Sequence, residues 1–396
     1  MARGRKAETV KKKINMLLFG EPFTGKSTFA AQAAYMHNED GSPMKVLYID
    51  CESGSIDNYL DKMEADGVDL GNIYILYTQS LGEILDYINK IKNNEDFYEI
   101  DENGNETEDI VVDANGNPFR PDIIIIDGVT VAHQAAQQGL LEFSKKRARV
   151  RANAKGLVGD EKLVSIEGSS LETRDWGNIA YKGSNLCLSL LGTGIHSIIT
   201  CREKDETVTV KDSDGKIASV PTGKKIPAGF KNLDYNTHTV IRFYRDDDDE
   251  VCANVLKDRT NIHPNEILVD PQLLDWQKII DNSVGKKDFV LNNTLDSAVL
   301  TEQEIYTAEV LNNSSISLSK SEMEKNKIEN ESNSADSNKG ITAMDIKAEI
   351  KNVISKLDPI AKKAMKEKLE SNNLPISYSK LTDVDVLNKI LATISK

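Results

Sequence analysis

Residues 14–28, INMLLFGEPFTGKST, determine the expected fold class more than any other stretch of the chain. The apolar part, Asn15–Phe19, predicts a buried strand, and residues 20–27 fit the pattern G-x-x-x-x-G-K-[ST] immediately before a predicted helix. Gly20 and Gly25 allow the backbone to turn with its N–H groups directed inward, where phosphate oxygens can be bound. A strand, this loop and a helix in that order predict a binding site for a nucleoside triphosphate.

The side chains of this loop have distinct expected roles. Lys26 is expected to reach the β- and γ-phosphates, and Ser27 to bind Mg²⁺ through its hydroxyl. The expected cofactors are therefore ATP and Mg²⁺. The predicted nucleotide contacts in the loop are Gly20, Glu21, Pro22, Phe23, Thr24, Gly25, Lys26, Ser27 and Thr28.

Carboxylates follow two further apolar runs. KVLYIDCES, residues 45–53, places Asp50 and Glu52 at the end of a predicted strand, and DIIIID ends at Asp127. Ligands bind beyond the carboxyl ends of the strands in parallel sheets. We therefore expect Asp127 to hold Mg²⁺ through water and Glu52 to orient or deprotonate the attacking water. Asp50 and Asp127 could instead cap the turns that follow their strands, and Glu52 could merely pair with a neighbouring cation.

Cations follow two later strands. Arg202 and Glu203 come directly after HSIITC, where a polar side chain can sense the γ-phosphate; the alternative is a solvated charge pair. Lys257 and Arg259 lie in VLKDRTN and could reach a phosphate in this subunit or in a neighbour. An ordinary surface pair with Asp258 is the alternative there.

Apolar runs that alternate with amphipathic stretches predict an α/β fold, with a mainly parallel sheet between helices. We expect a basic flexible arm over residues 1–13 and an ATPase domain over residues 14–282. An acidic insert, residues 93–121, is expected to form a protruding hairpin because it contains two Asn-Gly pairs. Further hairpins are expected at Asp214-Gly215 and across Asp246–Glu250. A polar, largely disordered linker (283–340) and a small helical module (341–396) complete the prediction.

The bulk composition limits the class of protein. The chain has 396 residues and a net charge of -14, which argues against a protein that coats nucleic acid with its whole surface. We expect no signal peptide and no membrane span, because no stretch reaches 18 apolar residues. The four cysteines show no metal-ligand spacing and are interpreted as reduced thiols of a cytoplasmic protein.

Two segments are candidates for contact with single-stranded DNA. FSKKRARVRANAK, residues 143–155, contains six Lys or Arg and no acid, although it could be merely a solvated helix face. PTGKKIPAGFKN, residues 221–232, is expected to form a mobile loop. The predicted DNA contacts are Lys145, Lys146, Arg147, Arg149, Arg151, Lys155, Lys224, Lys225, Phe230 and Lys231.

Taken together, GEPFTGKST, the strand ending IDCE and the late LKDR element resemble the RecA-like recombinase core over residues 14–270. The closer resemblance is to phage-encoded RecA-like single-strand annealing proteins. It implies that Glu52 is the catalytic glutamate and Asp127 the magnesium-side aspartate. It also implies that Lys257 and Arg259 extend into a neighbouring subunit's ATP site. Arg202 departs from the family, since RecA carries a nucleotide-sensing glutamine there.

The resemblance implies a DNA-dependent ATPase that binds single-stranded DNA and promotes annealing or strand exchange in phage recombination, in the cytoplasm of a bacterial host. Self-association into a ring or filament is expected. A helicase-like or packaging motor is one alternative, and a nucleotide-gated interaction protein with little catalysis is another. Residues 341–396 could bind a single-strand-binding protein, another replication protein or DNA, or could be a stabilising helical cap.

Overall fold

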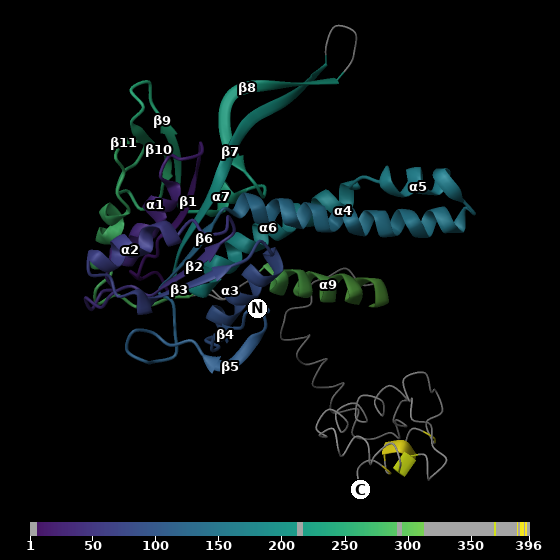
Figure 1. Ribbon diagram of the computed structural model, residues 1–396, viewed down its shortest axis with the longest axis horizontal. Helices are drawn as coiled ribbons and strands as arrows, with labels where there is room; N and C mark the ends of the chain where they lie inside the picture. Colours follow the sequence, from purple (N-terminus) through teal and green to yellow (C-terminus); the bar gives the residue numbers. More distant parts are fainter. Residues whose placement is uncertain are drawn as a thin grey trace. The chain divides into compact units, whose positions relative to one another are not determined.

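The computed structural model of the chain (Figure 1) describes residues 6–211, 217–290 and 295–312, together with seven single residues near the carboxyl end. The chain divides into two compact units, Met1–Thr307 and Ala308–Lys396. The first unit contains the sheet and every candidate nucleotide residue. Among the described residues, no helix is both long and apolar enough to cross a bilayer.

A nine-stranded sheet forms the centre of the first unit. Its strands are β1 (Asn15–Gly20), β2 (Val46–Asp50), β3 (Ile73–Tyr77), β6 (Ile123–Asp127), β7 (His196–Lys211), β8 (Ile217–Ala228), β9 (Thr239–Arg245), β10 (Val251–Asp258) and β11 (Ile267–Val269). The order is β11-β10-β9-β1-β7-β6-β2-β3, and β8 pairs with β7 outside this path. The run from β9 to β3 is parallel, whereas the pairs β7–β8, β9–β10 and β10–β11 are antiparallel. The predicted α/β fold with a mainly parallel sheet is confirmed.

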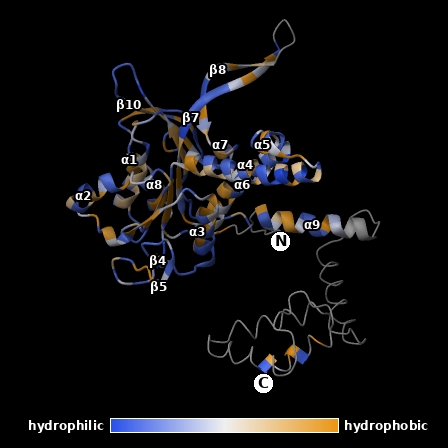
Figure 2. Ribbon diagram, turned by 45° about the vertical axis from the view of Figure 1, so that its right-hand side comes forward, coloured by the Kyte–Doolittle hydropathy of each residue, from blue (hydrophilic) through white to orange (hydrophobic). Residues whose placement is uncertain are grey.

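Helices cover both faces of this sheet (Figure 2). They are α1 (Lys26–Ala31), α2 (Asp57–Ala65), α3 (Leu81–Asn93), α4 (Val129–Ala154), α5 (Gly159–Glu167), α6 (Thr173–Thr193), α7 (Leu233–Asn236), α8 (Gln277–Asp281) and α9 (Leu295–Asn312), with short 3-10 turns η1 (Gln32–Tyr35), η2 (Leu70–Asn72) and η3 (Leu273–Trp276). Because successive side chains of a strand point to opposite faces, Leu17 and Phe19 join one core cluster, and Met16 and Leu18 join the other.

The two clusters anchor different helices. The first packs the sheet against α3, α4 and α6 through side chains such as Ile84 and Leu186. The second packs it against α1, α2, η3 and α8, where Phe29 contacts Trp276 edge-to-face at 5.9 Å between ring centroids. Each fully buried side chain of this size stabilises the fold by about 1.5–3 kcal/mol. Both clusters hold β1 rigidly, and with it the loop that follows.

The acidic insert forms the expected hairpin, with β4 (Tyr98–Ile100) antiparallel to β5 (Glu106–Ile110). It is attached to the body by its own apolar residues. Phe97, Val111 and Phe119 are buried in the first core cluster, and Tyr74 of β3 contacts both phenylalanine rings. The hairpin thus extends from a firmly packed base.

Both strands of the hairpin expected at Asp214-Gly215 are present, since Lys211 of β7 pairs with Ile217 of β8. The turn, residues 212–216, lies outside the described residues. The expected mobile loop over residues 221–232 is wrong for residues 221–228. These residues belong to β8, which pairs with the outer half of β7 from Arg202 to Lys211. Backbone pairing with a neighbouring strand orders a stretch whose Pro and Gly content had indicated a loop. The β9–β10 hairpin is confirmed, with Arg245 opposite Val251.

Two predicted boundaries are corrected, that of the arm over residues 1–13 and that of the linker over residues 283–340. Residues 10–13 do not form a free arm: Val10 bridges to Lys287, and the Lys11 ammonium lies 3.0 Å from Glu39 and 3.4 Å from Asp288. The expected linker contains helix α9, where the Asp296 carboxylate accepts hydrogen bonds from Tyr181 and Asn185. Most of residues 313–396 lie outside the described residues, and those described in the predicted helical module are helical: Lys368, Leu369, Val386, Lys389, Ile390, Leu391 and Thr393.

Candidate nucleotide site

Strand register brings the candidate residues to one edge of the sheet. Gly20 at the end of β1 pairs with Arg202 of β7, and Asp50 at the end of β2 pairs with Asp127 of β6. The ends of β1, β2 and β6 therefore meet beside Arg202 of β7, a strand that continues to Lys211, although these segments are far apart in the sequence. Their ends line a cleft with a volume of about 830 Å³, which is large enough for a nucleotide.

The phosphate loop has the predicted turn geometry. A Cβ on Gly20 would lie 1.9 Å from the carbonyl oxygen of Phe243, so the loop can lie against β9 only with glycine there. Gly25 has a φ of 81°, the left-handed conformation that glycine adopts without strain. Pro22 through Thr28 line the cleft, whereas the side chain of Glu21 is directed to Arg242, 3.6 Å away. Gly20 and Glu21, which were also predicted as nucleotide contacts, are not among the residues that line the cleft.

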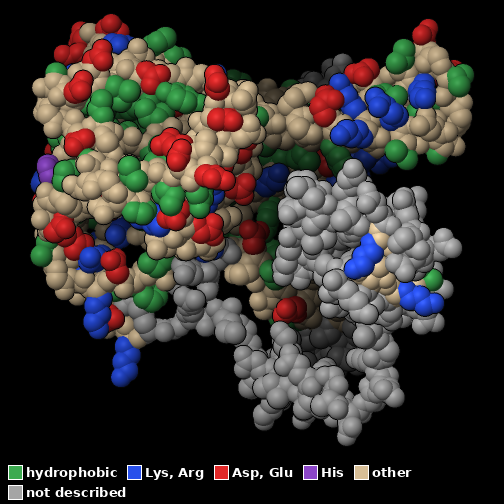
Figure 3. All heavy atoms as spheres, turned by 60° about the horizontal axis from the view of Figure 1, so that its bottom comes forward, with side chains coloured by type: hydrophobic (Ala, Val, Ile, Leu, Met, Phe, Trp, Pro, Cys, Tyr) green, Lys and Arg blue, Asp and Glu red, His purple; other side chains and the backbone are tan. Residues whose placement is uncertain are grey.

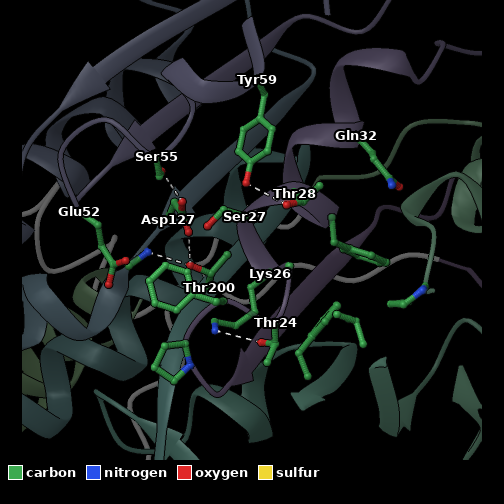
Figure 4. Close-up of a pocket in the computed structure, with 18 of the residues that line it drawn as sticks. Thr24, Lys26, Ser27, Thr28, Gln32, Glu52, Ser55, Tyr59, Asp127 and Thr200 are labelled. Carbon is green, nitrogen blue, oxygen red and sulfur yellow. Dashed lines mark hydrogen bonds between the residues drawn. The ribbon is translucent and has the colours of Figure 1, made fainter. Parts of the chain in front are cut away.

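Lys26 lies over the loop itself. Its ammonium donates hydrogen bonds to the carbonyl oxygens of Gly20, at 3.2 Å, and of Glu21, and lies 3.5 Å from the Thr24 hydroxyl (Figure 4). Burial lowers the pKa of Lys26, and the negative charge of nearby Glu52 and Asp127 opposes this shift. The carbonyl oxygens are weaker partners than phosphate, so a bound triphosphate would attract the ammonium away from them.

Asp127 is held by three hydroxyl groups that the sequence did not single out. Oδ2 accepts from Tyr48 at 2.7 Å and from Ser55 at 2.6 Å, and Oδ1 accepts from Thr200. Figure 4 shows Asp127 between Ser55 and Thr200, with Ser27 beside it. Thr200 is the last residue of the HSIIT run, two residues before Arg202, so the sequence could have indicated its position; the roles of Tyr48 and Ser55 depend on how β2 and its following loop pack.

The donor chemistry near Asp127 fits Mg²⁺. The Ser27 hydroxyl and the Asp127 carboxylate are oxygen ligands of the kind this ion prefers. Among the described residues, no group of three or more His, Cys, Asp or Glu could hold a metal ion without help. A magnesium ion at this point would take its remaining ligands from water and phosphate, as nucleotide-bound Mg²⁺ does.

Asp50 and Glu52 have different roles. Asp50 is fully buried and accepts hydrogen bonds from the backbone N–H groups of Glu52, Gly54 and Ser55 at 2.7–2.9 Å. It therefore caps the turn, the alternative that the sequence left open for it. Glu52 lines the cleft, and its Oε1 accepts from Nε and Nη2 of Arg202 at 3.1 and 2.9 Å. The predicted base and the predicted phosphate sensor form an ion pair.

The far end of the cleft is lined by residues that sequence reasoning missed. Arg245 and Val251 come from the β9–β10 hairpin, and Asp270–Gln272 follow β11. The amide groups of Gln32 and Gln272 hydrogen-bond to each other at 2.7 Å across this end. These segments carry no motif, because their place in the cleft results from β9 pairing with β1 and from β10 and β11 folding back beside β9.

Lys257 and Arg259 lie at the opposite edge of the sheet. Because β10 runs antiparallel to β9, its end is level with Thr239, whereas the phosphate loop is level with Phe243. The Lys257 ammonium donates to the carbonyl oxygens of Asp234, Tyr235 and Thr237 at 2.5–3.0 Å. Neither residue lines the cleft of its own chain, so the structure does not support the possibility of a phosphate contact within the same subunit.

Residues 143–154 of the basic run lie on α4 and Lys155 follows its end; α4 projects from the body together with α5 and part of α6 (Figure 1). Half of its cations are paired with acids: Lys145 with Glu142 and Glu167, Arg147 with Asp175, and Arg151 with Glu172. Across the described parts of the chain, no ion pair involves the other three cations, which are Lys146, Arg149 and Lys155. Figure 3 shows Lys and Arg side chains gathered on this projection.

The residues of the second candidate DNA segment, 221–232, lie in different environments. Lys224 and Lys225 lie on β8, where Lys225 pairs with Asp205 at 2.9 Å and Lys224 approaches Glu206 at 3.9 Å. Lys231 is exposed, but Phe230 is only 2% exposed and packs edge-to-face on His133 at 4.8 Å. Phe230 is a core residue between α4 and α6, so the prediction that it contacts DNA is corrected.

The chain is similar to a known protein family and to a solved structure. Residues 12–262 match a protein family described as an AAA domain, a range that includes the phosphate loop, Glu52, Asp127 and Arg202. Among solved structures, the chain is similar to a KaiC-like protein from the hyperthermophilic archaeon Pyrococcus horikoshii OT3. The identity is 18% and the TM-score 0.32, over 65% of this chain and 89% of that chain. No curated protein matches the sequence.

Proposed function

Since the chain belongs to this AAA-domain family and has the core of a P-loop ATPase, we propose that it hydrolyses ATP in response to single-stranded DNA and promotes annealing or strand exchange. A role in phage recombination in a bacterial cell fits the RecA-like motifs. The observation that carries the proposal is the convergence of Lys26, Ser27, Glu52 and Asp127 on one nucleotide-sized cleft.

Each residue of the cleft has a task in this proposal. The loop N–H groups and Lys26 bind the phosphates and stabilise the charge that develops on them. Ser27 and Asp127, the latter fixed by its three hydroxyl partners, would hold Mg²⁺, which neutralises phosphate charge when bound. Glu52 lies across the cleft, where a carboxylate can accept a proton from water attacking the γ-phosphate.

DNA contact is proposed for the unpaired cations of the α4 projection. Lys146, Arg149 and Lys155 leave their charges available for phosphates, whereas Lys145, Arg147 and Arg151 hold the projection together. A backbone-directed contact of this kind suits binding without sequence preference. Lys224, Lys225 and Lys231 near the β7–β8 hairpin are a second group of proposed contacts.

Self-association is proposed from the place of Lys257 and Arg259. They lie at the edge of the sheet away from their own cleft, so they could complete a nucleotide site only in a neighbouring subunit. An arrangement in which each subunit contacts the next head-to-tail closes into a ring or extends as a filament. Residues 341–396 are proposed to bind a single-strand-binding or replication protein.

The test measures ATP hydrolysis with and without single-stranded DNA at low and moderate salt. We expect stimulation that fades with salt. The Lys146→Ala/Arg149→Ala variant should bind DNA more weakly, with the slope of log affinity against log salt reduced by about 1.4. The matched control is Lys62→Ala/Lys278→Ala, which removes two exposed lysines from the body of the molecule.

Two outcomes would redirect the proposal. ATP binding without DNA retention would contradict a recombination role and favour a nucleotide-gated interaction protein, with the acidic β4–β5 hairpin as a partner surface. Continuous unwinding or translocation would favour a motor.

A further inference from the structure

The ion pair between Glu52 and Arg202 lies inside the nucleotide cleft. In ATP hydrolysis these residues would have separate roles, Glu52 as the base and Arg202 as the sensor of the γ-phosphate. One carboxylate oxygen, Oε1, accepts two hydrogen bonds from the guanidinium group, at 3.1 and 2.9 Å. The side chains remain 36% and 56% exposed, so the pair is open to an incoming ligand. Both residues line the same cleft as Lys26 and Ser27.

The backbone on each side of the pair is firmly held. The Glu52 N–H donates to buried Asp50 at 2.8 Å, and the Arg202 N–H donates to the Thr130 hydroxyl at 3.0 Å. The Glu52 side chain also lies against Gly128, where a Cβ would approach its Cγ to 2.4 Å. A change of partner can therefore occur by side-chain rotation, with little movement of the sheet.

The γ-phosphate competes with Glu52 for the guanidinium group. Arginine forms strong charge-assisted hydrogen bonds with phosphate oxygens as well as with carboxylates, and a terminal phosphate carries more charge than one carboxylate. ADP lacks this phosphate. Only the triphosphate can offer Arg202 a better partner than the one it already has.

We propose that Arg202 exchanges Glu52 for the γ-phosphate when ATP binds, so that the ion pair distinguishes ATP from ADP and releases the base only in the ATP-bound state. This inference rests on the proposed ATPase function. The pair holds the carboxylate of Glu52 in the empty and ADP-bound cleft. Only ATP binding requires the pair to break, so the free energy of breaking it weakens the binding of ATP and not that of ADP. A glutamine in place of Arg202 could not form such an ion pair.

A double-mutant cycle tests the exchange by binding rather than hydrolysis. The affinities for a non-hydrolysable ATP analogue and for ADP, both with Mg²⁺, are measured for the full chain and for Glu52→Gln, Arg202→Ala and the double variant. We expect Glu52→Gln to tighten analogue binding about fivefold, because Arg202 is no longer held by a carboxylate. ADP affinity should stay unchanged. In the Arg202→Ala background the same change should have less than a twofold effect.

A matched control separates this exchange from general charge effects. Arg245 also lines the cleft, but it donates to the carbonyl oxygens of Phe23 and Asp249. Arg245→Ala should leave the effect of Glu52→Gln intact. An equal gain with and without Arg202 would mean that Glu52 merely repels the phosphate, and no gain at all would mean that the pair does not oppose ATP binding; either result overturns the inference.

The failure of the proposed ATPase function gives a different pattern. If the unchanged protein binds neither nucleotide, both the function and the inference are wrong. If it binds both nucleotides and hydrolyses ATP but the cycle shows no coupling, the inference alone is wrong. Thermal unfolding of each variant confirms that the cleft is intact, since both side chains are partly exposed and their loss should not prevent folding.

Discussion

Lys26 and Lys257 lie at opposite edges of the same sheet, and both bind backbone carbonyl oxygens. The ammonium group of Lys26 contacts two carbonyl oxygens and a hydroxyl of the phosphate loop, and that of Lys257 contacts three carbonyl oxygens at the end of α7. Burial lowers the pKa of both groups. The two ammonium groups thus have similar hydrogen-bond partners.

Their surroundings differ. Lys26 faces a cleft that also contains Ser27 and Asp127, so its ammonium can exchange carbonyl oxygens for phosphate. Lys257 closes the end of a short helix whose last carbonyl groups have no helical partner. The function of a lysine therefore depends on which other hydrogen-bond acceptors its ammonium can reach, and not only on the acceptors that it contacts in the empty protein. Three predictions test this difference.

The largest effect is expected for Lys26→Ala. Loss of the ammonium removes the charge that stabilises the β- and γ-phosphates, so hydrolysis should fall at least about 100-fold. The free energy of unfolding should change by less than about 1 kcal/mol, since loop carbonyls near the cleft can be solvated. Steady-state hydrolysis and urea unfolding give the two values. A fully active variant would remove Lys26 from the mechanism.

Lys257→Met should show the reverse pattern. Three carbonyl oxygens of residues 234, 235 and 237 lose their donor, and the free energy of unfolding should fall by about 1–3 kcal/mol. Nucleotide affinity at low protein concentration should be unchanged. Arg259→Ala is the control: its exposed side chain should contribute within about 0.5 kcal/mol. At a protein concentration that permits assembly, lost hydrolysis would support the proposed contact of Lys257 with a neighbouring cleft, and full hydrolysis would contradict it.

The third prediction concerns acid stability at the edge where Lys257 lies. His196, at the start of β7, is buried and accepts a hydrogen bond from the Ile14 N–H at 2.9 Å; burial lowers its pKa to about 3. The unfolded chain takes up this proton near pH 6.5, so the stabilisation is present above that pH. It is lost as the pH falls toward 3, by at most about 1.4 kcal/mol per pH unit.

Urea unfolding at pH 7, 6 and 5 measures this loss. His196→Gln should flatten the pH dependence, and His37→Gln, which changes an exposed histidine, should not. Equal slopes for the three proteins would show that His196 does not determine acid stability at this edge.

Local sequence was sufficient for elements whose geometry is set within a few residues. The phosphate loop, the strand ending at Asp127 and the β9–β10 hairpin were all predicted, because glycine placement, apolar runs and turn residues act locally. The predictions for residues 10–13, residues 221–228 and Phe230 were wrong for a common reason. Each depended on a partner distant in the sequence: Lys287, the outer half of β7, and the packing of α4 on α6.

The sequence by itself determined the chemistry of this protein: a phosphate loop, carboxylates at the ends of buried strands and an acid-free basic run. The tertiary structure decided which of these groups meet. Strand order placed Arg202 beside Gly20 and within hydrogen-bonding distance of Glu52, and the antiparallel direction of β10 carried Lys257 away from the cleft. Side-chain type is a local property, whereas the partner of a side chain depends on sheet register and strand direction, which arise only when distant segments pack together.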